Sequence, residues 1–341
     1  MSRSAMSNDA SHAGGGAAPR IAVVIPCFKV SRHILGVLSG IGPEVTAIVV
    51  VDDACPERTG DVVEGGCGDP RVVVVRHEQN SGVGAAVLSG YRRAIELGAD
   101  IIVKLDGDGQ MDAALLPRFV HPIQSGIADY TKGNRFYDLR QIGRMPHVRM
   151  FGNAVLSFLA KASTGYWDVF DPTNGYTAID ARVAAMLPHD RISRRYFFET
   201  DMLFRLGTFR AVVVDIPMDA RYEDETSNLH VRKVVGEFLL KHARNLLKRI
   251  FYGYFLRDMS IASLELLAGL GMLVFGVGFG LYHWWHAFAT GAATPIGTVM
   301  LAAMPTLVGL QLVLAFLSYD IASVPRLPLS RRLRDLPRAP A

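Results

Sequence analysis

Cysteine is scarce in this sequence, which has 341 residues and only Cys27, Cys55 and Cys67. Their number is odd, and their spacing matches no common metal-binding pattern. The sequence therefore predicts neither a disulfide framework nor a zinc site. Thiols in such small numbers fit a reducing compartment, where each packs as a small apolar side chain.

Charge of one sign is not in excess either. The chain carries 36 Lys and Arg residues against 32 Asp and Glu residues, a formal net charge of +4. Nucleic-acid-binding domains are usually more basic, so no nucleic-acid partner is expected. Residues 1–19 are small and polar, with a glycine run at 14–16 and no apolar core. This composition excludes a secretory signal and predicts a disordered leader.

Long apolar runs are confined to the C-terminal part of the chain. Half of all residues are hydrophobic, and the mean hydropathy is +0.22. Two stretches, at about 260–282 and 295–319, each hold the roughly 20 apolar residues needed to cross a bilayer. They predict a hairpin of two transmembrane helices, joined by a loop that contains the aromatic run 283–286.

The charges around this hairpin predict its orientation. Lys and Arg residues precede the first stretch and follow the second, whereas the connection has neither. The positive-inside rule then places both termini and the preceding domain in the cytoplasm, in an integral protein of the cell (inner) membrane. Residues 229–258 combine apolar and basic residues at helical spacing, which predicts amphipathic helices in the membrane interface. Helices that bind a protein partner are the alternative.

Strand and helix patterns alternate in the first part of the chain. Four apolar runs predict strands, at 21–25, 45–51, 72–75 and 101–105. Helical patterns at 31–39 and 81–97 lie between them, while residues 128–131 predict an edge strand and residues 211–216 the last strand. This order predicts an α/β fold with a doubly wound, mostly parallel sheet. Ligands of such sheets bind beyond the carboxyl ends of the strands.

Two carboxylates and an amide follow the strand at 101–105, at intervals of two residues. In an extended chain Asp106, Asp108 and Gln110 can face the same point. Gly107 and Gly109 leave room for a ligand beside the backbone. Hard oxygen donors of this kind suit Mg²⁺ or Mn²⁺ carrying a diphosphate. The alternative is an ordinary polar turn after a strand.

The other strand ends also carry residues that suit ligand binding: Pro26 and Phe28, Asp52 and Asp53, and Asn80–Gly84. All of these ends are expected to converge on one crevice. The glycine pattern of dinucleotide-binding folds does not follow the first strand, which excludes that type of site. The glycines at 82 and 84 either begin a helix or let the backbone approach a nucleotide.

Segments 25–28, 51–54, 80–84 and 105–110 resemble, in order and spacing, the motifs of family 2 glycosyltransferases with the GT-A fold. The chain looks most like the branch of dolichol-phosphate mannose synthase and bacterial polyprenyl-phosphate glycosyltransferases. The resemblance implies a metal site at Asp106, Asp108 and Gln110. It also implies that a nucleotide sugar is bound by Pro26, Phe28, Asp52, Asp53, Asn80, Gly84 and Asp106, with Asp52 and Asp53 on the base and ribose. Residues 54–55 depart from the family's pattern, so the identity of the nucleotide base stays open.

The resemblance further implies a site for the phosphate of the acceptor. Arg135 stands in a segment similar to the family's Gly-x-Arg-aromatic motif, and Arg149 and Asn153 resemble an Arg-x-x-x-Ser pair that grips phosphate. Residues four apart share one face of a helix. Arg221 and Ser227 match part of an Arg-x-x-Gly-x-Ser-Lys segment, whose Gly and Lys are absent here. A basic face that touches water or anionic lipid is the alternative.

Three carboxylates are candidates for a general base. Asp171 lies in a turn that resembles the family's Asp-rich turn, although such turns are also common structural features. Glu199 and Asp201 either supply a base or complement the N-terminus of a helix. A phosphate acceptor needs no strong base, because its second pKa is about 6. The catalytic set implied by the resemblance is Asp108, Asp171, Arg135, Arg149 and Arg221.

Taken together, the sequence predicts an inverting, metal-dependent glycosyltransferase that moves one sugar from a UDP- or GDP-sugar to a polyprenyl phosphate. The predicted parts are a leader (1–19), a GT-A domain (20–228), juxtamembrane helices (229–258), the hairpin (259–320) and a basic cytoplasmic tail (321–341). The alternatives are a glycosyltransferase acting on a lipid or glycan hydroxyl and a non-catalytic nucleotide-sugar-binding membrane scaffold. A processive polysaccharide synthase is disfavoured, because the chain has no Gln-x-x-Arg-Trp motif. Whether the protein forms a homo-oligomer stays open.

Overall fold

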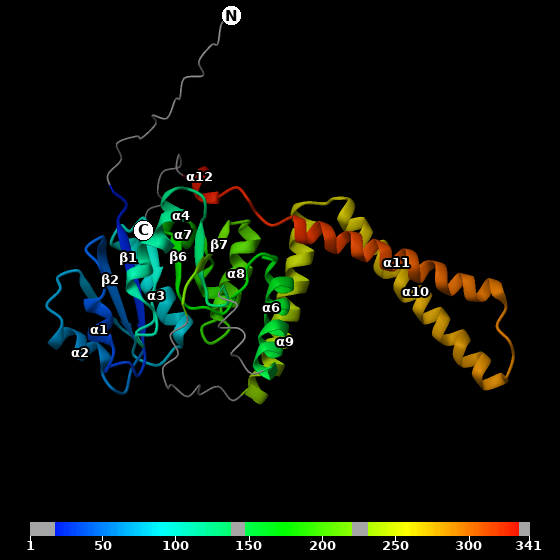
Figure 1. The fold of residues 1–341 in the computed structure, drawn as a ribbon, viewed down its shortest axis with the longest axis horizontal. Coiled ribbons are helices and arrows are strands. Elements are labelled where there is room, and N and C mark those ends of the chain that lie inside the picture. Colours follow the sequence, from blue (N-terminus) through cyan, green and yellow to red (C-terminus); the bar gives the residue numbers. More distant parts are fainter. Residues whose placement is uncertain (1–17, 138–146, 220–230, 334–341) are drawn as a thin grey trace, which may run out of the picture.

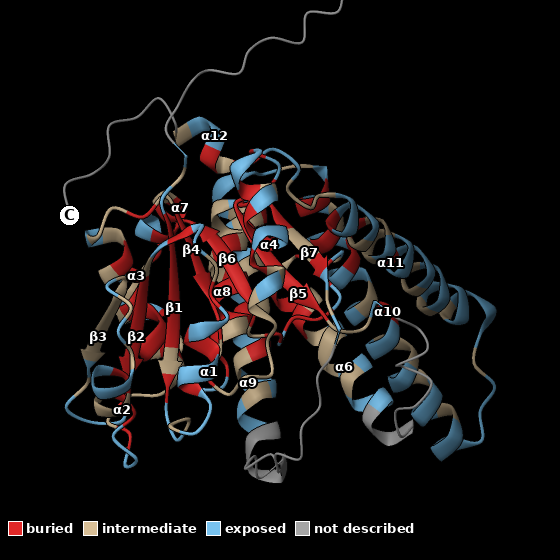
Figure 2. Ribbon diagram, turned by 60° about the vertical axis from the view of Figure 1, so that its left-hand side comes forward, coloured by how far each residue is buried: buried red, intermediate tan, exposed pale blue. Residues whose placement is uncertain are grey.

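The structure, a computed structural model, describes residues 18–137, 147–219 and 231–333. It consists of an α/β domain from which two long helices project side by side (Figure 1). Strands form the centre of the domain, and helices cover both faces of the sheet (Figure 2). The predicted α/β class is confirmed.

One sheet of seven strands runs through the described part of the domain, in the order β3-β2-β1-β4-β6-β5-β7. Neighbouring strands are parallel except at β6, which is antiparallel to β4 and β5. The mostly parallel sheet is therefore as predicted. The strands are β1 (Ile21–Cys27), β2 (Val45–Asp52), β3 (Val72–Arg76), β4 (Ile101–Lys104), β5 (Tyr130–Asn134), β6 (Thr177–Asp180) and β7 (Val213–Pro217).

The prediction of an edge strand at residues 128–131 is wrong. The strand there, β5, lies inside the sheet between β6 and β7, and β7 forms the edge. Tyr130 pairs with Ile179 on one side and with Val213 on the other. Packing between distant segments decides which strands pair when they are separated by a long connection. The local sequence pattern therefore does not predict the neighbours of such a strand.

Alternate residues of the central strands enter two separate cores. Ala22 and Val24 of β1 pack with α3, α7 and α8 on one face of the sheet. Val23 and Ile25 pack with α1 and α4 on the other face. This is the period of two expected for a strand covered on both sides. The helices are α1 (Ile34–Ser39), α2 (Thr59–Gly66), α3 (Val83–Glu96), α4 (Leu116–Gln124), α6 (His147–Thr164), α7 (Ala181–Met186) and α8 (Phe198–Phe209).

The C-terminal part of the chain is almost entirely helical. Its elements are α9 (Val231–Ile250), the π-helix Phe251–Arg257, α10 (Ile261–Thr290), α11 (Ile296–Ala322) and α12 (Leu329–Leu333). Helices α10 and α11 are long and apolar enough to cross a membrane, and only 17% and 11% of their most apolar windows are buried. The aromatic run 283–286, predicted to lie in the connecting loop, belongs to α10 instead. Tryptophan and histidine do not break a helix, whereas Gly291 has the positive φ of a helix end.

Close backbone contact joins the two long helices. A Cβ atom added at Gly276 of α10 would lie 2.7 Å from the backbone nitrogen of Thr306 in α11. One added at Gly309 of α11 would lie 2.8 Å from the backbone nitrogen of Leu273. Small residues thus allow the helices to pack as a hairpin, as they do in many membrane proteins.

Both ends of the hairpin are attached to the α/β domain. Near the end of α11, the buried carboxylate of Asp320 accepts hydrogen bonds from both Nη atoms of Arg249, at 2.6 and 2.9 Å. It also accepts from Tyr254 Oη at 2.5 Å and from Trp167 Nε1 at 2.8 Å. Trp167 follows α6, so this network connects the hairpin to the domain as well as to α9.

The chain after the hairpin returns to the domain at Asp129. This fully buried carboxylate accepts hydrogen bonds from the backbone nitrogens of Leu329 and Ser330, at 2.8 and 2.7 Å, and from that of Val212 at 2.8 Å. The chain after α11 therefore packs against the α/β domain.

We expect Asp129→Ala to detach the tail. Three backbone donors would lose a charged acceptor, which should lower the free energy of unfolding by about 3 kcal/mol. Limited trypsin digestion should then cut after Arg326 and Arg331 at least tenfold faster than in the unmodified chain. Asp190→Ala removes a carboxylate that is 79% exposed and serves as the control. Equal cleavage rates in the two variants would contradict this role of Asp129.

Candidate active site

The carboxyl ends of β1, β2 and β4 meet at one edge of the sheet, as the strand order predicts. Cys27 of β1 pairs with Asp52 of β2, and Val24 of β1 pairs with Lys104 of β4. The backbone nitrogen of Asp53 donates to the carbonyl of Cys27 at 3.1 Å. The acidic segments that follow β2 and β4 therefore lie on either side of β1.

A buried lysine that the sequence analysis did not single out stands at the end of β4. Lys104 Nζ lies 2.8 Å from Asp106 Oδ1 and 3.4 Å from Glu199 Oε1, and its side chain is only 2% exposed. Burial acts to lower the pKa of Lys104, but the two carboxylates outweigh it and raise that pKa. The only signal in the sequence was one charged residue within an apolar strand.

Asp106 and Asp108 follow this lysine in the loop predicted to hold a metal. The Asp106 carboxylate is 30% exposed, and Asp108 Oδ1 accepts a hydrogen bond from the backbone nitrogen of Gln110 at 3.0 Å. Gly109 between them has a φ of +81°, which favours glycine. Residues 18–137, 147–219 and 231–333 contain no group of three His, Cys, Asp or Glu side chains suited to a metal ion. Two carboxylates and an amide fit Mg²⁺ or Mn²⁺ whose remaining ligands are water and substrate phosphates.

Asp52 and Asp53 bind loops of their own chain. Asp52 accepts hydrogen bonds from the backbone nitrogens of Cys55 and Gly60, both at 2.7 Å. Asp53 accepts from those of Ser81 and Gly82, at 2.9 and 2.8 Å, and its Oδ1 lies 2.7 Å from His77 Nδ1. Both side chains are buried. The two carboxylates thus fix the loops after β2 and β3, and direct contact with a base or ribose stays a prediction.

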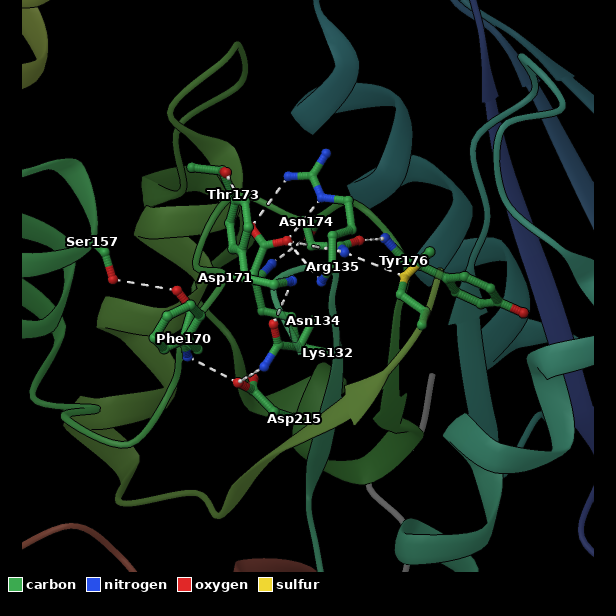
Figure 3. Close-up of polar contacts among 12 residues, drawn as sticks. Lys132, Asn134, Arg135, Ser157, Phe170, Asp171, Thr173, Asn174, Tyr176 and Asp215 are labelled. Carbon is green, nitrogen blue, oxygen red and sulfur yellow. Dashed lines mark hydrogen bonds and ion pairs between the residues drawn. The ribbon is translucent and has the colours of Figure 1, made fainter. Parts of the chain in front are cut away.

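Two of the residues predicted to bind the acceptor phosphate, Arg135 and Asn153, line a small pocket together with Asp171. Figure 3 shows Arg135 beside Asp171. Arg135 Nε and Nη2 donate to the two oxygens of Asp171, at 2.8 and 3.2 Å. Asp171 is fully buried, and Asn153 of α6 also lines the pocket. Arg149 lies one turn before Asn153, but only its backbone is described. Arg221 and Ser227 lie outside the described residues.

The turn between Asp171 and β6 connects this pocket to the Asp106 loop. Asn174 donates to Asp171 Oδ2 at 3.3 Å, and its carbonyl accepts a hydrogen bond from the buried amine of Lys132. A Cβ atom added at Gly175 would lie 2.5 Å from Asp106 Oδ2 and 2.6 Å from Lys104 Nζ. A side chain at position 175 would therefore displace this ion pair.

Two more ionisable groups lie beneath the pocket, and the sequence analysis overlooked both. Burial lowers the pKa of Lys132 to about 8 and raises that of Asp215 to about 6. Asp215 Oδ2 accepts from the backbone nitrogen of Phe170 at 2.8 Å and from Asn134 Nδ2 at 3.3 Å. Its Oδ1 is buried without a hydrogen-bond partner in the described part of the chain.

The two other candidate bases are also engaged. Glu199 pairs with Lys104 as described above. Asp201 accepts from the backbone nitrogen of Ser193 at 2.8 Å and from Asn245 Nδ2 at 3.2 Å. Because Asn245 belongs to α9, Asp201 connects α8 to α9.

Comparison with known proteins identifies the family. The model of glycosyl transferase family 2 matches residues 22–186. The chain is 30% identical to the undecaprenyl-phosphate mannosyltransferase of Micrococcus luteus over 230 residues, which cover 66% of this chain and 93% of that protein. The chain belongs to glycosyltransferase family 2.

A second relative of this glycosyltransferase is a UDP-N-acetylglucosamine–dolichyl-phosphate N-acetylglucosaminyltransferase of Methanococcus voltae. The two are 26% identical over 63% of this chain and 91% of that protein. Among solved structures, glucosyl-3-phosphoglycerate synthase from Mycobacterium tuberculosis in complex with UDP has a TM-score of 0.50 and 21% identity, over 68% of this chain and 80% of that one. The likeness to this structure shows that the domain has the GT-A type of fold.

Asp215→Asn should change how stability depends on pH. A carboxyl whose pKa rises from 3.8 to about 6 on folding stabilises the folded state below pH 3.8. That contribution is lost as the pH rises through about 6. The neutral variant should therefore melt about 3 °C above the unmodified glycosyltransferase at pH 7.5, with a smaller difference at pH 4.5. A pH-independent difference between the two melting curves would argue against a raised pKa at Asp215.

Proposed function

We propose that this glycosyltransferase is an inverting, metal-dependent enzyme that transfers one sugar from a UDP- or GDP-sugar to a polyprenyl phosphate at the cytoplasmic membrane face. The observation that carries the proposal is the turn Asp171–Gly175. Its first residue binds Arg135 in the small pocket that Asn153 also lines, and its last packs against Asp106 of the predicted metal site. One short turn therefore joins a site suited to a diphosphate donor with a site suited to a phosphate acceptor.

The names of the two relatives support the acceptor class. One is named for undecaprenyl phosphate and the other for dolichyl phosphate, so both act on a polyprenyl phosphate. They are named for different sugars, mannose and N-acetylglucosamine. The polyprenyl phosphate is therefore the shared feature, and the sugar has to be found by experiment.

Transfer with inversion requires an acceptor oxygen opposite the diphosphate. We expect a phosphate oxygen to form a bond to the anomeric carbon while the bond to the diphosphate breaks and its electron pair leaves with the diphosphate. A divalent cation held by Asp106, Asp108 and Gln110 would neutralise the charge on that leaving group. Arg135, whose guanidinium is oriented by Asp171, aligns the acceptor phosphate.

The three carboxylates predicted as candidate bases favour a phosphate acceptor over a hydroxyl acceptor. A hydroxyl requires a general base, and the candidates were Asp171, Glu199 and Asp201. Asp171 and Glu199 each form an ion pair with a cation, and Asp201 accepts a hydrogen bond from a backbone amide. A phosphate with a second pKa of about 6 is already ionised at neutral pH and needs alignment instead.

The outer faces of α6 and α9 support a membrane-bound acceptor. Apolar side chains are exposed on both helices, among them Phe151 (73%) and Phe158 (58%) of α6 and Leu240 (72%) and Leu247 (69%) of α9. Such side chains suit the headgroup region of a bilayer. With the hairpin in the membrane and basic residues at both its ends, the positive-inside rule favours a cytoplasmic catalytic domain.

A transfer assay tests the proposal. The purified full chain in detergent is incubated with Mg²⁺ or Mn²⁺, undecaprenyl phosphate and a panel of radiolabelled UDP- and GDP-sugars. We expect one lipid-linked product, its loss on adding EDTA, and at least a hundredfold lower rate for Asp108→Ala. The control is Asp190→Ala, which should transfer at the unmodified rate. If a donor binds but no lipid product forms with any sugar, the hydroxyl-acceptor enzyme or the non-catalytic scaffold is the better description.

Gly175→Ala tests the turn that joins the two sites. Its methyl group would displace the pair formed by Lys104 and Asp106, and a misplacement of about 1 Å can lower a rate by roughly a hundredfold. We expect a ten- to hundredfold lower transfer rate with a melting temperature within about 3 °C of the unmodified enzyme. The control is Gly65→Ala, where the added atom would meet nothing within 4 Å. Equal rates for both variants would mean that the turn does not fix the geometry of the site.

A further inference from the structure

A second pocket lies where the hairpin joins the catalytic domain, away from the active site. Its volume is about 350 Å³, and it is lined by the end of α6, the end of α8, the π-helix and the chain after α11. Thr164 of α6 lines it, whereas Asn153 of the same helix lines the acceptor pocket. Eleven residues of helix separate the two, or roughly 16 Å along the axis. The two pockets are therefore distinct.

This joint pocket lies at the domain end of the two helices that are long and apolar enough to cross a membrane. Residues Asp258 and Ser260, just before α10, line it from one side, and residues Ser323 and Pro325, just after α11, line it from the other. Apolar side chains are exposed beside it, among them Leu256 (66%) and Met259 (72%). Tyr252 and Tyr319 also line the pocket, and tyrosine is enriched at membrane–water interfaces.

Three arginines line the joint pocket, and one of them uses all three of its guanidinium nitrogens for hydrogen bonds within the protein. Arg249 donates both Nη atoms to Asp320 and its Nε to the carbonyl of Ala162 at 3.0 Å. This bidentate pair cancels the two buried charges and forms a fixed wall. Arg249 and Asp320 therefore shape the pocket without adding net charge to it.

Arg210 and Arg257 keep donors for a ligand. Arg210 uses Nη2 for the carbonyl of Ser323 at 3.2 Å. Arg257 uses Nη1 for the carbonyl of Thr208 at 2.9 Å and Nε for Asp258 at 3.0 Å. A guanidinium has five N–H donors, so these contacts leave most of them for an anion. Asp258 is 61% exposed, so water screens its pairing with Arg257.

We propose that the joint pocket binds the phosphate headgroup of an anionic phospholipid. A phosphodiester is matched by two guanidinium groups, which donate to its oxygens in parallel pairs. Its acyl chains extend along the exposed apolar side chains beside the pocket and the first turns of α10. The bound lipid then holds the catalytic domain at a fixed height on the membrane, together with the Asp320 network.

Lipid binding by the intact protein tests this assignment without any sugar transfer, so its failure would leave the proposed function unaffected. Native mass spectrometry of the full chain in detergent is used to titrate dioctanoyl phosphatidylglycerol, dioctanoyl phosphatidylcholine and inorganic phosphate. We expect one tightly bound phosphatidylglycerol, at least tenfold weaker binding of phosphatidylcholine, and no displacement by equimolar phosphate.

The variant Arg210→Gln with Arg257→Gln should bind phosphatidylglycerol at least tenfold more weakly. Arg210→Lys, which keeps the charge but loses the paired donors, should bind phosphatidylglycerol with an affinity between those of the unmodified chain and the double variant. The matched control is Arg118→Gln, an exposed arginine of α4 outside the pocket. Thermal unfolding shows whether each variant is folded.

Three results would overturn the proposal. They are equal binding of the two lipids, unchanged phosphatidylglycerol binding in the double variant, and displacement of the lipid by equimolar inorganic phosphate. The last would identify a site for small anions instead of a lipid site.

Discussion

The ion pair between the buried Asp171 and the partly exposed Arg135 is the interaction on which the arrangement of the candidate active site depends. Asp171 has no exposed surface, and a carboxylate in that position is tolerated only with a matched cation and additional donors. Arg135 supplies the cation from the end of β5, and Asn174 and Thr173 supply further donors. The turn that satisfies Asp171 continues into Gly175, which packs on Asp106. Charge compensation at one residue thus fixes the position of the predicted acceptor site relative to the predicted metal site.

Compensation of buried charge also connects the catalytic domain to the hairpin. Asp320 lies near the end of an apolar helix, where an unpaired carboxylate would be costly. Arg249, Tyr254 and Trp167 satisfy it from three different segments. Asp129 does the same for the backbone of the returning tail. Under the proposed function the acceptor phosphate lies at the membrane surface, and these networks would hold the active site at a constant height and tilt above it.

Acidic motifs in this glycosyltransferase serve structure as well as ligands. Asp52 and Asp53 stand where the family resemblance implies contact with a nucleotide, yet both accept hydrogen bonds from backbone nitrogens of the loops beside them. Their removal would disturb the nucleotide site even without a direct contact. Asp201 similarly connects two helices. Loss of activity on mutating any of these residues would therefore not by itself identify a ligand contact.

The sequence was enough to predict the alternating strands and helices, the two apolar helices and the acidic loop after β4, because each depends on local periodicity or on neighbouring residues. It also singled out Arg135, Asn153 and Asp171 through short motifs. The tertiary structure was needed to show that β5 lies inside the sheet, that Lys104 and Lys132 are buried beside the site, and that the half-buried Asp215 lies with them. The physical reason is that strand neighbours and ion-pair partners are set by contacts between distant segments. Lys104 meets Glu199 across 95 residues, and Trp167 meets Asp320 across 153.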